Sequence, residues 1–589
     1  MSAVLGIVGE GSLDELRRMA ARMAYRGREL RVARPAPRIL FGELHAQAGE
    51  LDTDATCCLE ADGPLYPRGP RDVRPFEEAC AGDRVRLAAD FHRRGVAALD
   101  QLTGAYALAH WDEAGNAVTL ATDALGFKTI HVVELPGRVA FASDYKALLA
   151  LEDCPAELDR DALQTYLTHF RSPPGRSFLK GIRPLSEAAR CRIRDGHATL
   201  ERRRPPARAS TVRSFSVAAR TLRARLEFAV VSQLAGVDSA GVLLSGGFDS
   251  TALIALVRHV RPDVGLASYT IGHGPEDPDI LGARAVAAHF GCEHRETVFD
   301  LSRLAEDLPR VVWRTEDLSG RDESLLQSTI TEIAAARHRV VLSGYGADAL
   351  FAGMPRHRLL WLRDHAPPPL RGALCELYLY TQYRRVPGSW LGRKLVARAF
   401  NGDVVLAPRI RDARTIGAEG RCLDLRSYRQ AHKAPTAGFQ HDEPMLAAHG
   451  ASLAMPFLDP AVAQCALASP NRHHIGLRVQ KRLLRAAVAD LLPPSMRGMR
   501  KTIQRFRHDR AQTQAFEPLF TELDLARSLA DRGLVAADGV AALFEHRPDG
   551  ALSPERMHAL WALASAELWM RLFVDRRGQG LPEPLRRAS

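Results

Sequence analysis

The sequence predicts an α/β protein with two unlike halves, on two observations. In the first 150 residues, short segments of alternating apolar and polar residues recur between turns, a pattern typical of strands. After about residue 215, buried apolar strands alternate with helical segments, and the strands at 242–244 and 340–344 end in glycine turns. That alternation predicts a parallel, doubly wound sheet, which binds ligands at the carboxyl ends of its strands.

The N-terminal half is expected to be a sandwich of sheets flanked by helices. Strands are predicted at residues 3–8, 105–109, 117–121 and 139–142, and amphipathic helices at residues 13–23 and 85–91. The segment 201–208 is polar and broken by Pro205 and Pro206, so it predicts a domain boundary. One domain is therefore expected over residues 1–205 and a second over residues 206–589.

The C-terminal half is expected to hold the parallel sheet. Further strands are predicted at residues 266–272 and 296–299, with a helix at residues 281–290. Residues from about 355 to 440 are rich in arginine, aromatic residues and proline without strong periodicity, which indicates an insertion. The tail over residues 516–573 is predicted to be helical, and Trp561, Leu568, Trp569 and Phe573 form a stripe more typical of core than of a ligand site.

Composition places the chain among ordinary globular proteins, with 46% apolar and 25% charged residues in 589. The net charge of +11 is scattered along the chain, so no nucleic-acid partner is expected. Nine cysteines at irregular spacings argue against a disulfide framework, and the lack of a CxxC pair argues against zinc. With no signal peptide and no apolar stretch near 18 residues, we expect a cytoplasmic protein without a membrane span.

The turn at Ser245–Ser250 has the composition of an anion-binding site. Gly246 and Gly247 permit a tight turn after a buried strand, and the helix that follows aims free backbone N–H groups at one point. Asp249 within the turn suggests a metal ion that screens a polyphosphate. The sequence has no GxxxxGK[ST] loop, and a purely structural strand–turn–helix corner stays open as an alternative.

Four motifs, in order along the chain, resemble those of asparagine synthetases and their relatives. The motifs are SGGFDS at 245–250, SGYGADALF at 343–351, MPFLD at 455–459, and KRLLR at 481–485 followed by Leu492, Pro493 and Lys501. Residues 25–27, 104–107, 123–126 and 141–148 are similar to the glutaminase half of that family. The resemblance implies an N-terminal Ntn-hydrolase-like (class II glutaminase-like) αββα sandwich. It also implies a C-terminal doubly wound α/β domain of the ATP pyrophosphatase type, with helical additions.

The resemblance also implies the roles of individual residues in binding ATP and Mg²⁺. Leu244, Ile271 and Gly344 match positions that hold adenosine, and Ser245, Gly246, Gly247, Ser250 and Ser343 belong to the turns that hold the phosphates. Asp249 and Asp348 would share Mg²⁺. Lys501, 20 residues after Lys481, has the spacing of the catalytic lysine and would stabilise charge in the reaction. Lys481 is left open between a role in the site and a solvated helix residue.

Three departures from the family pattern bear on function. Ser2 stands where the nucleophilic cysteine of a glutaminase is needed, and Asp62 replaces an asparagine. We therefore expect the N-terminal domain to be catalytically inactive, without ammonia for asparagine formation. Tyr345 replaces a glutamate and is similar to the tyrosine of β-lactam synthetases, which pairs with a glutamate to deprotonate an amine of the substrate. Glu443 is the predicted partner, with a surface position as the alternative.

These departures predict a reaction within one molecule, in which an ATP-activated carboxylate is attacked by an amine. Residues 384–391 (RRVPGSWL) in the insertion resemble a segment of lasso-peptide macrolactam cyclases. The expected substrate is a precursor peptide freed of its leader, and the expected partners are a leader peptidase and a leader-binding protein. A small-molecule β-lactam or amide synthetase and a non-catalytic nucleotide-binding scaffold remain as alternatives. The peptide, its ring size and the oligomeric state are not predicted.

Overall fold

A computed structural model shows two domains joined by a helical tail. It describes residues 2–45, 56–62, 65–66, 76–123, 126–169, 175–185, 189–202, 212–318, 323–354, 357–383, 391, 394, 436–499 and 509–580. The predicted domain boundary at residue 205 and most of the predicted insertion lie outside these residues.

The N-terminal domain consists of two stacked sheets. The first has the strand order β2 (Glu29–Ala36), β3 (Ile39–His45), β1 (Ser2–Gly9), β8 (Arg138–Ala142), β7 (His131–Leu135) and β9 (Arg183–Pro184). The second has the order β11 (His197–Arg202), β10 (Ala189–Arg194), β6 (Ala117–Thr122), β5 (Ala105–Asp112) and β4 (Cys57–Asp62). Neighbouring strands in both sheets pair antiparallel.

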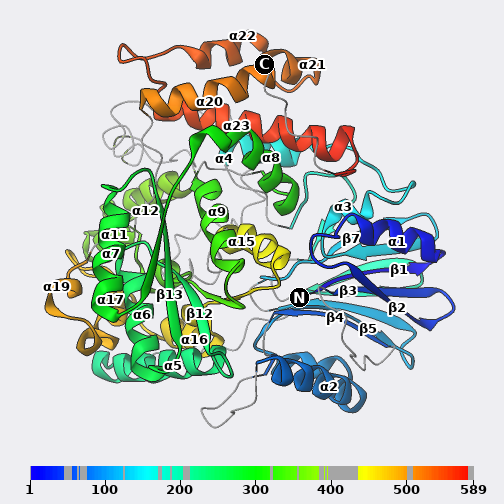
Figure 1. Ribbon diagram of the computed structural model, residues 1–589, viewed down its shortest axis with the longest axis horizontal. Coiled ribbons are helices and arrows are strands. Elements are labelled where there is room, and N and C mark those ends of the chain that lie inside the picture. Colours follow the sequence, from blue (N-terminus) through cyan, green and yellow to red (C-terminus); the bar gives the residue numbers. More distant parts are fainter. Residues whose placement is uncertain are drawn as a thin grey trace.

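Apolar side chains from both sheets form the core between them. Phe41 and Phe141 of the first sheet pack against Val118 and Leu120 of the second. Helices α1 (Leu13–Ala21) and α3 (Tyr145–Leu148) cover the outer face of the first sheet, and α2 (Phe76–Arg94) covers that of the second (Figure 1). The predicted αββα sandwich is therefore confirmed, with α2 longer than the predicted helix.

The C-terminal domain has one five-stranded sheet in which all neighbouring strands run parallel. Its order is β14 (Glu293–Val298), β13 (Gly265–Gly272), β12 (Ser239–Leu243), β15 (Val340–Leu342) and β16 (Ser452–Ala454). Helices α5 (Phe215–Gln233), α6 (Phe248–Val260) and α7 (Pro278–Phe290) pack on one side. Helices α8 (Leu304–Thr315), α9 (Glu323–Ala335) and α15 (Thr436–Ala448) pack on the other (Figure 1). The predicted doubly wound sheet is confirmed, and the three-residue strand β16 is an addition to it.

The predicted insertion begins with two helices that the sequence pattern did not reveal. Helices α11 (His357–His365) and α12 (Pro368–Tyr383) pack against each other. Many of their side chains are exposed, so neither helix has a wide apolar stripe to make it recognisable in the sequence. Proline at the first position of α12 costs no hydrogen bond, because that N–H has no partner within a helix.

The helical tail rests on both domains. Helices α20 (Arg510–Glu522) and α23 (Pro554–Met570) belong to it, and α23 lies across the top of both domains in Figure 1. Trp561, Leu568, Trp569 and Phe573 are buried, which confirms the predicted core stripe. The Trp569 indole N–H donates a hydrogen bond to the Tyr145 hydroxyl of the N-terminal domain at 2.6 Å. The tail therefore contributes to holding the domains together.

Two general predictions can be compared with the described residues. No helix among them is long and apolar enough to cross a membrane. Cys57, Cys58, Cys80, Cys154, Cys191, Cys292 and Cys465 are free thiols, but Cys375 in α12 is disulfide-bonded. The irregular cysteine spacing gave no sign of the bond at Cys375.

Candidate active site

The first glycine turn lies between β12 and α6, at the carboxyl edge of the parallel sheet. Gly246 has φ +64°, and a Cβ atom there would lie 2.7 Å from the backbone nitrogen of Ala283. Only glycine fits this position without strain. The Ser250 hydroxyl lies 3.4 Å from the backbone nitrogen of Ser245. The turn thus brings small polar groups and the N-terminus of a 13-residue helix to one place, as anion binding requires.

The second glycine turn lies beside the first, after β15. A Cβ at Gly344 would lie 3.3 Å from the Cβ of Asp249, so the two turns nearly touch. Gly346 has φ +88°, and Leu458 fills the space where its side chain would lie. Asp348 follows in the first turn of α10 (Ala347–Phe351). Asp249 and Asp348 therefore lie close together across neighbouring strand ends.

A buried lysine joins these two aspartates. The Lys481 ammonium lies 2.6 Å from both carboxylate oxygens of Asp249 and 2.6 Å from Oδ1 of Asp348. Its side chain is buried, and its backbone is left-handed at φ 56°, which is uncommon for a residue with a side chain. Burial lowers the pKa of Lys481, but the two aspartates raise it above its ordinary value overall. Of the two alternatives left open for Lys481, the structure favours a place in the site.

The aspartate pair could hold a divalent cation. Their oxygens converge on one positive group, and the lysine ammonium stands where a cation is favourable. Within the described residues, no three His, Cys, Asp or Glu side chains are arranged to hold a metal ion together. A magnesium ion here would therefore need further oxygen ligands from a nucleotide or water.

Tyr345 lies in the second turn and contacts a carboxylate, but that carboxylate belongs to Asp442. A hydrogen bond joins the phenol to Asp442, which is fully buried in helix α15. Thr331 Oγ1 donates to Asp442 Oδ1 at 3.0 Å, and Gln327 Nε2 lies 3.4 Å from Oδ2. Burial raises the pKa of Asp442 to about 7, although its hydrogen bonds act in the opposite direction. Burial and Asp442 together raise the pKa of Tyr345 well above its usual value.

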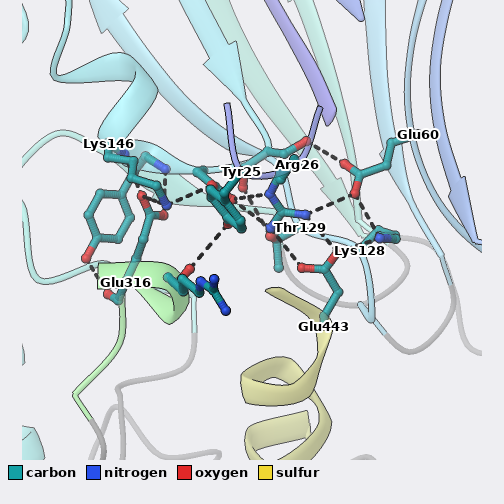
Figure 2. A network of polar contacts seen from close by, with 12 residues as sticks. Tyr25, Arg26, Glu60, Lys128, Thr129, Lys146, Glu316 and Glu443 are labelled. Carbon is teal, nitrogen blue, oxygen red and sulfur yellow. Dashed lines mark hydrogen bonds and ion pairs between the residues drawn. The ribbon is translucent and has the colours of Figure 1, made fainter. Parts of the chain in front are cut away.

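The predicted pairing of Tyr345 with Glu443 is wrong. Glu443 instead points into the N-terminal domain, where its oxygens accept two hydrogen bonds from Arg26, both at 2.8 Å (Figure 2). Lys128 Nζ lies 2.5 Å from the same carboxylate. Burial raises the pKa of Glu443, but Arg26 and Lys128 outweigh it and bring the value to about 2. Such a carboxylate is a poor proton acceptor near neutral pH.

The error has a geometric cause. Successive residues on a helix point about 100° apart, so only one of Asp442 and Glu443 can face Tyr345. The run His441-Asp442-Glu443 offers two neighbouring acids, and only the direction of α15 decides between them. Because Asp442 is the neighbour of Glu443, the sequence offered it as a second possible partner of Tyr345.

Other predicted residues lie at the same edge of the sheet. Leu244 and Ile271 are buried at the ends of β12 and β13, and Ser343 is buried after β15. Asp459 of the MPFLD motif caps α16 (Pro460–Ala468), because its carboxylate accepts from the backbone nitrogen of Ala461 at 2.8 Å. Lys501, predicted to be catalytic, lies outside the described residues.

The N-terminal domain places Ser2 at the start of strand β1. Its backbone pairs with His45 of β3, next to Ala3 opposite Leu44. The side chains of Ser2 and Asp62 lie outside the described part of the chain. The prediction that this domain lacks glutaminase activity therefore rests on residue type alone.

Comparison with known proteins agrees with the sequence motifs. The asparagine synthase family matches residues 221–571, and the glutamine amidotransferase domain matches residues 79–203. A putative glutamine-hydrolysing asparagine synthetase of Mycobacterium tuberculosis H37Rv is 30% identical over 458 residues, which cover 70% of this chain and 69% of that protein. Carboxyethyl-arginine β-lactam synthase of Streptomyces clavuligerus is 27% identical over 300 residues, 50% of this chain and 55% of that one.

A comparison of folds also finds solved structures. Glutamine phosphoribosylpyrophosphate amidotransferase from B. subtilis matches with a TM-score of 0.25 and 11% identity, over 52% of this chain and 92% of that chain.

Proposed function

Because this chain belongs to the asparagine synthetase family of ATP-dependent carbon–nitrogen ligases, we propose that it is a lasso-peptide macrolactam synthetase. An Asp or Glu side-chain carboxylate of a precursor core peptide attacks the α-phosphorus of ATP, and pyrophosphate leaves. The N-terminal amine of the same peptide then attacks the acyl-adenylate. A C–N bond forms, the C–O bond to AMP breaks, and the products are an isopeptide-bonded ring and AMP.

The glycine turns supply the ATP site. The helix N-terminus after Gly247 and the hydroxyls of Ser245 and Ser250 would hold the phosphates. Asp249 and Asp348 would hold Mg²⁺, which neutralises charge on the leaving pyrophosphate when it is bound. Lys481, already beside both aspartates, would contribute a second positive charge.

The observation that carries the proposal is the contact between Tyr345 and Asp442. The protonated N-terminal amine must lose one proton before it can attack and a second as the neutral amide forms. Tyr345 can take a proton from the amine and pass its own to Asp442, whose pKa of about 7 suits an acceptor at neutral pH. Thr331 holds the Asp442 carboxylate in place through its 3.0 Å hydrogen bond to Oδ1.

Ser2 in place of a cysteine favours an amine that belongs to the substrate. Serine is far less ionised than cysteine near neutral pH, so glutamine hydrolysis by this domain is not expected. Incubation with glutamine and ATP should release no glutamate. Release of glutamate coupled to formation of a primary amide would instead support an asparagine synthetase reaction.

The sequence of the insertion supports a peptide substrate. Residues 384–391 resemble a segment of lasso cyclases, and the chain has a net charge of +11 that suits an acidic peptide. Such a reaction requires a leader peptidase to free the amine and a leader-binding protein to deliver the precursor. We expect all of these to act in the cytoplasm.

A small-molecule lactam synthetase is the second candidate. The similarity to carboxyethyl-arginine β-lactam synthase of Streptomyces clavuligerus favours it, because that protein is named for forming a lactam. In this reaction the same site would activate a small amino acid that carries both the carboxylate and the amine. The two candidates differ in substrate size and not in the role of Tyr345.

The deciding experiment combines the purified protein, ATP, Mg²⁺ and a leader-free core peptide. We expect stoichiometric AMP and a peptide mass reduced by one water. Asp249→Asn should abolish AMP formation without unfolding the protein, because asparagine keeps the volume but loses the charge. AMP formation with a β-amino acid and none with peptides would favour the small-molecule candidate. Binding of ATP without release of pyrophosphate for any substrate would favour a scaffold.

A further inference from the structure

Helix α15 connects the proposed acceptor to the other domain through two consecutive residues. Asp442 points to Tyr345 and to Thr331 of α9, while Glu443 points to Arg26 and Lys128 of the N-terminal domain. Figure 2 shows the Glu443 side chain directed away from α15, toward Arg26 and Lys128 beside the sheets of that domain. A shift of the helix that moved Glu443 would therefore move Asp442 with it.

The contacts of Glu443 are strong and specific. Arg26 donates hydrogen bonds to both carboxylate oxygens, and this bidentate geometry fixes the direction of the contact as well as its distance. Lys128 and Arg26 are both buried, so neither charge is screened by solvent. The carboxylate thus has one favourable position, between these two cations.

The cations themselves are anchored to strands of the N-terminal domain. Arg26 Nε donates to Asp144 at 2.9 Å, and Lys128 lies 2.9 Å from Glu60. The Ser143 hydroxyl joins Glu60 at 2.5 Å and lies 3.3 Å from the Val4 carbonyl of β1. Glu60 lies in β4 and Val4 in β1, and Ser143 and Asp144 directly follow β8, so the paired strands of both sheets give Glu443 a rigid reference point.

Helix α15 depends on such anchors because of its own sequence. Pro444 follows Glu443 inside the helix, and proline has no N–H to donate to the preceding turn. The backbone is therefore weakened next to the two acids. Side-chain contacts must then fix the direction of this turn of the helix.

We propose that Arg26 and Lys128 are positioning residues that hold Asp442 against Tyr345 through Glu443. The inference rests on the proposed function, in which Asp442 accepts the proton of the attacking amine. It gives the N-terminal domain a role in ring closure that does not require glutamine hydrolysis.

The test is Glu443→Gln, compared with Tyr345→Phe and the double variant. Adenylation, measured as exchange of labelled pyrophosphate into ATP, and the KM for ATP should stay within about twofold of the wild type. The kcat of ring closure should fall about tenfold or more. In the double variant the losses should not multiply, because Glu443 acts only through the tyrosine and its acceptor.

The matched control is Lys146→Met. Lys146 is equally buried and joins the same two domains through Asp144, at 2.7 Å, and Glu316 (Figure 2). It shares Asp144 with Arg26 but, within the described residues, contacts no side chain of α15, and Arg26 keeps its own bond to Asp144 in this variant. It should leave the ratio of adenylation to ring closure unchanged. If Glu443→Gln does not fold, Lys128→Met replaces it, because the two hydrogen bonds from Arg26 remain to support folding. Ring closure should then fall relative to adenylation, although by less than in Glu443→Gln, because one of the two cations that position Glu443 is lost.

A second measurement does not depend on the substrate. Hydrogen exchange of α15 should be faster in Glu443→Gln than in Lys146→Met. Exchange equal in the two variants, or losses that multiply in the double variant, would overturn the positioning role. If the wild type closes no ring but α15 responds as expected, the proposed function fails and the anchoring of Asp442 stands.

Discussion

Lys481 donates hydrogen bonds to both carboxylate oxygens of Asp249, each at 2.6 Å. The same ammonium reaches Asp348 on the neighbouring strand end, so one buried cation holds both proposed metal ligands. Lys481 is therefore the charge that organises the proposed phosphate end of the site.

Lys481→Met should lower the rate of adenylation by about 10²- to 10³-fold, the range found when one charge-stabilising donor is removed. Pyrophosphate release measures this rate. The control is Lys180→Met, which removes an exposed ion pair with Glu157 and should change nothing. Unchanged pyrophosphate release in Lys481→Met would contradict a role for its charge.

A second prediction concerns the space beside Asp348. A Cβ atom at Gly353 would overlap Asp348 Oδ1 and Lys481 Cε, so Gly353→Ala must push these groups apart. We expect adenylation to fall at least about tenfold, because small displacements of charged groups cost this much or more. Gly372→Ala in α12 is the control, since its Cβ would meet open space and alanine favours a helix. Equal rates of pyrophosphate release in the two variants would show that the position of Asp348 and Lys481 beside Gly353 does not matter for adenylation.

The sequence predicted the fold and the place of the two glycine turns at the carboxyl edge of the sheet, because both depend on local signals. Gly246 and Gly346 mark turns with positive φ, and both turns follow buried strands that end at Leu243 and Leu342. Asp249 and Asp348 follow these turns at fixed offsets. In a parallel sheet, residues at such offsets must meet at the carboxyl edge.

The partner of Tyr345 could not be predicted in the same way. Tyr345 and Asp442 are almost a hundred residues apart, and nothing local fixes the rotation of α15. The role of Glu443 depends on Arg26 and Lys128, which belong to the other domain. Helices α11 and α12 were missed because their exposed faces weaken the apolar pattern.

The contact between the tail and the N-terminal domain predicts a stability effect. Trp569 is fully buried, and its indole N–H donates to Tyr145 and also lies 3.1 Å from the Glu316 carbonyl. Trp569→Phe should lower the free energy of unfolding by about 1–3 kcal/mol, through the lost hydrogen bonds and a small cavity. Urea unfolding measures the change. Trp361→Phe, at a partly exposed position, should cost less, and the reverse order would contradict the structural role of Trp569.

The raised pKa of Asp442 predicts opposite effects of pH on activity and on stability. Asp442 must be ionised to accept a proton, so the kcat of ring closure should rise with pH around its pKa of about 7. The folded chain binds this proton more tightly than the unfolded chain, because burial raises the pKa from its ordinary value of 3.8. Raising the pH from about 4 to about 7 should therefore lower the contribution of Asp442 to the free energy of unfolding, by up to about 4 kcal/mol.

Asp442→Asn separates this contribution from those of other acids. Glu443 and Asp144 have lowered pKa values, so their contributions change at lower pH and in the opposite direction. The difference in unfolding free energy between the wild type and Asp442→Asn, measured with urea at several pH values, should shift in favour of the variant as pH rises to about 7. The variant should also close rings slowly and without a pH step near 7. If this difference in unfolding free energy stays constant with pH, Asp442 is ionised over the whole range. Tyr345 would then face a fixed negative charge, and Asp442 would not exchange a proton near neutral pH.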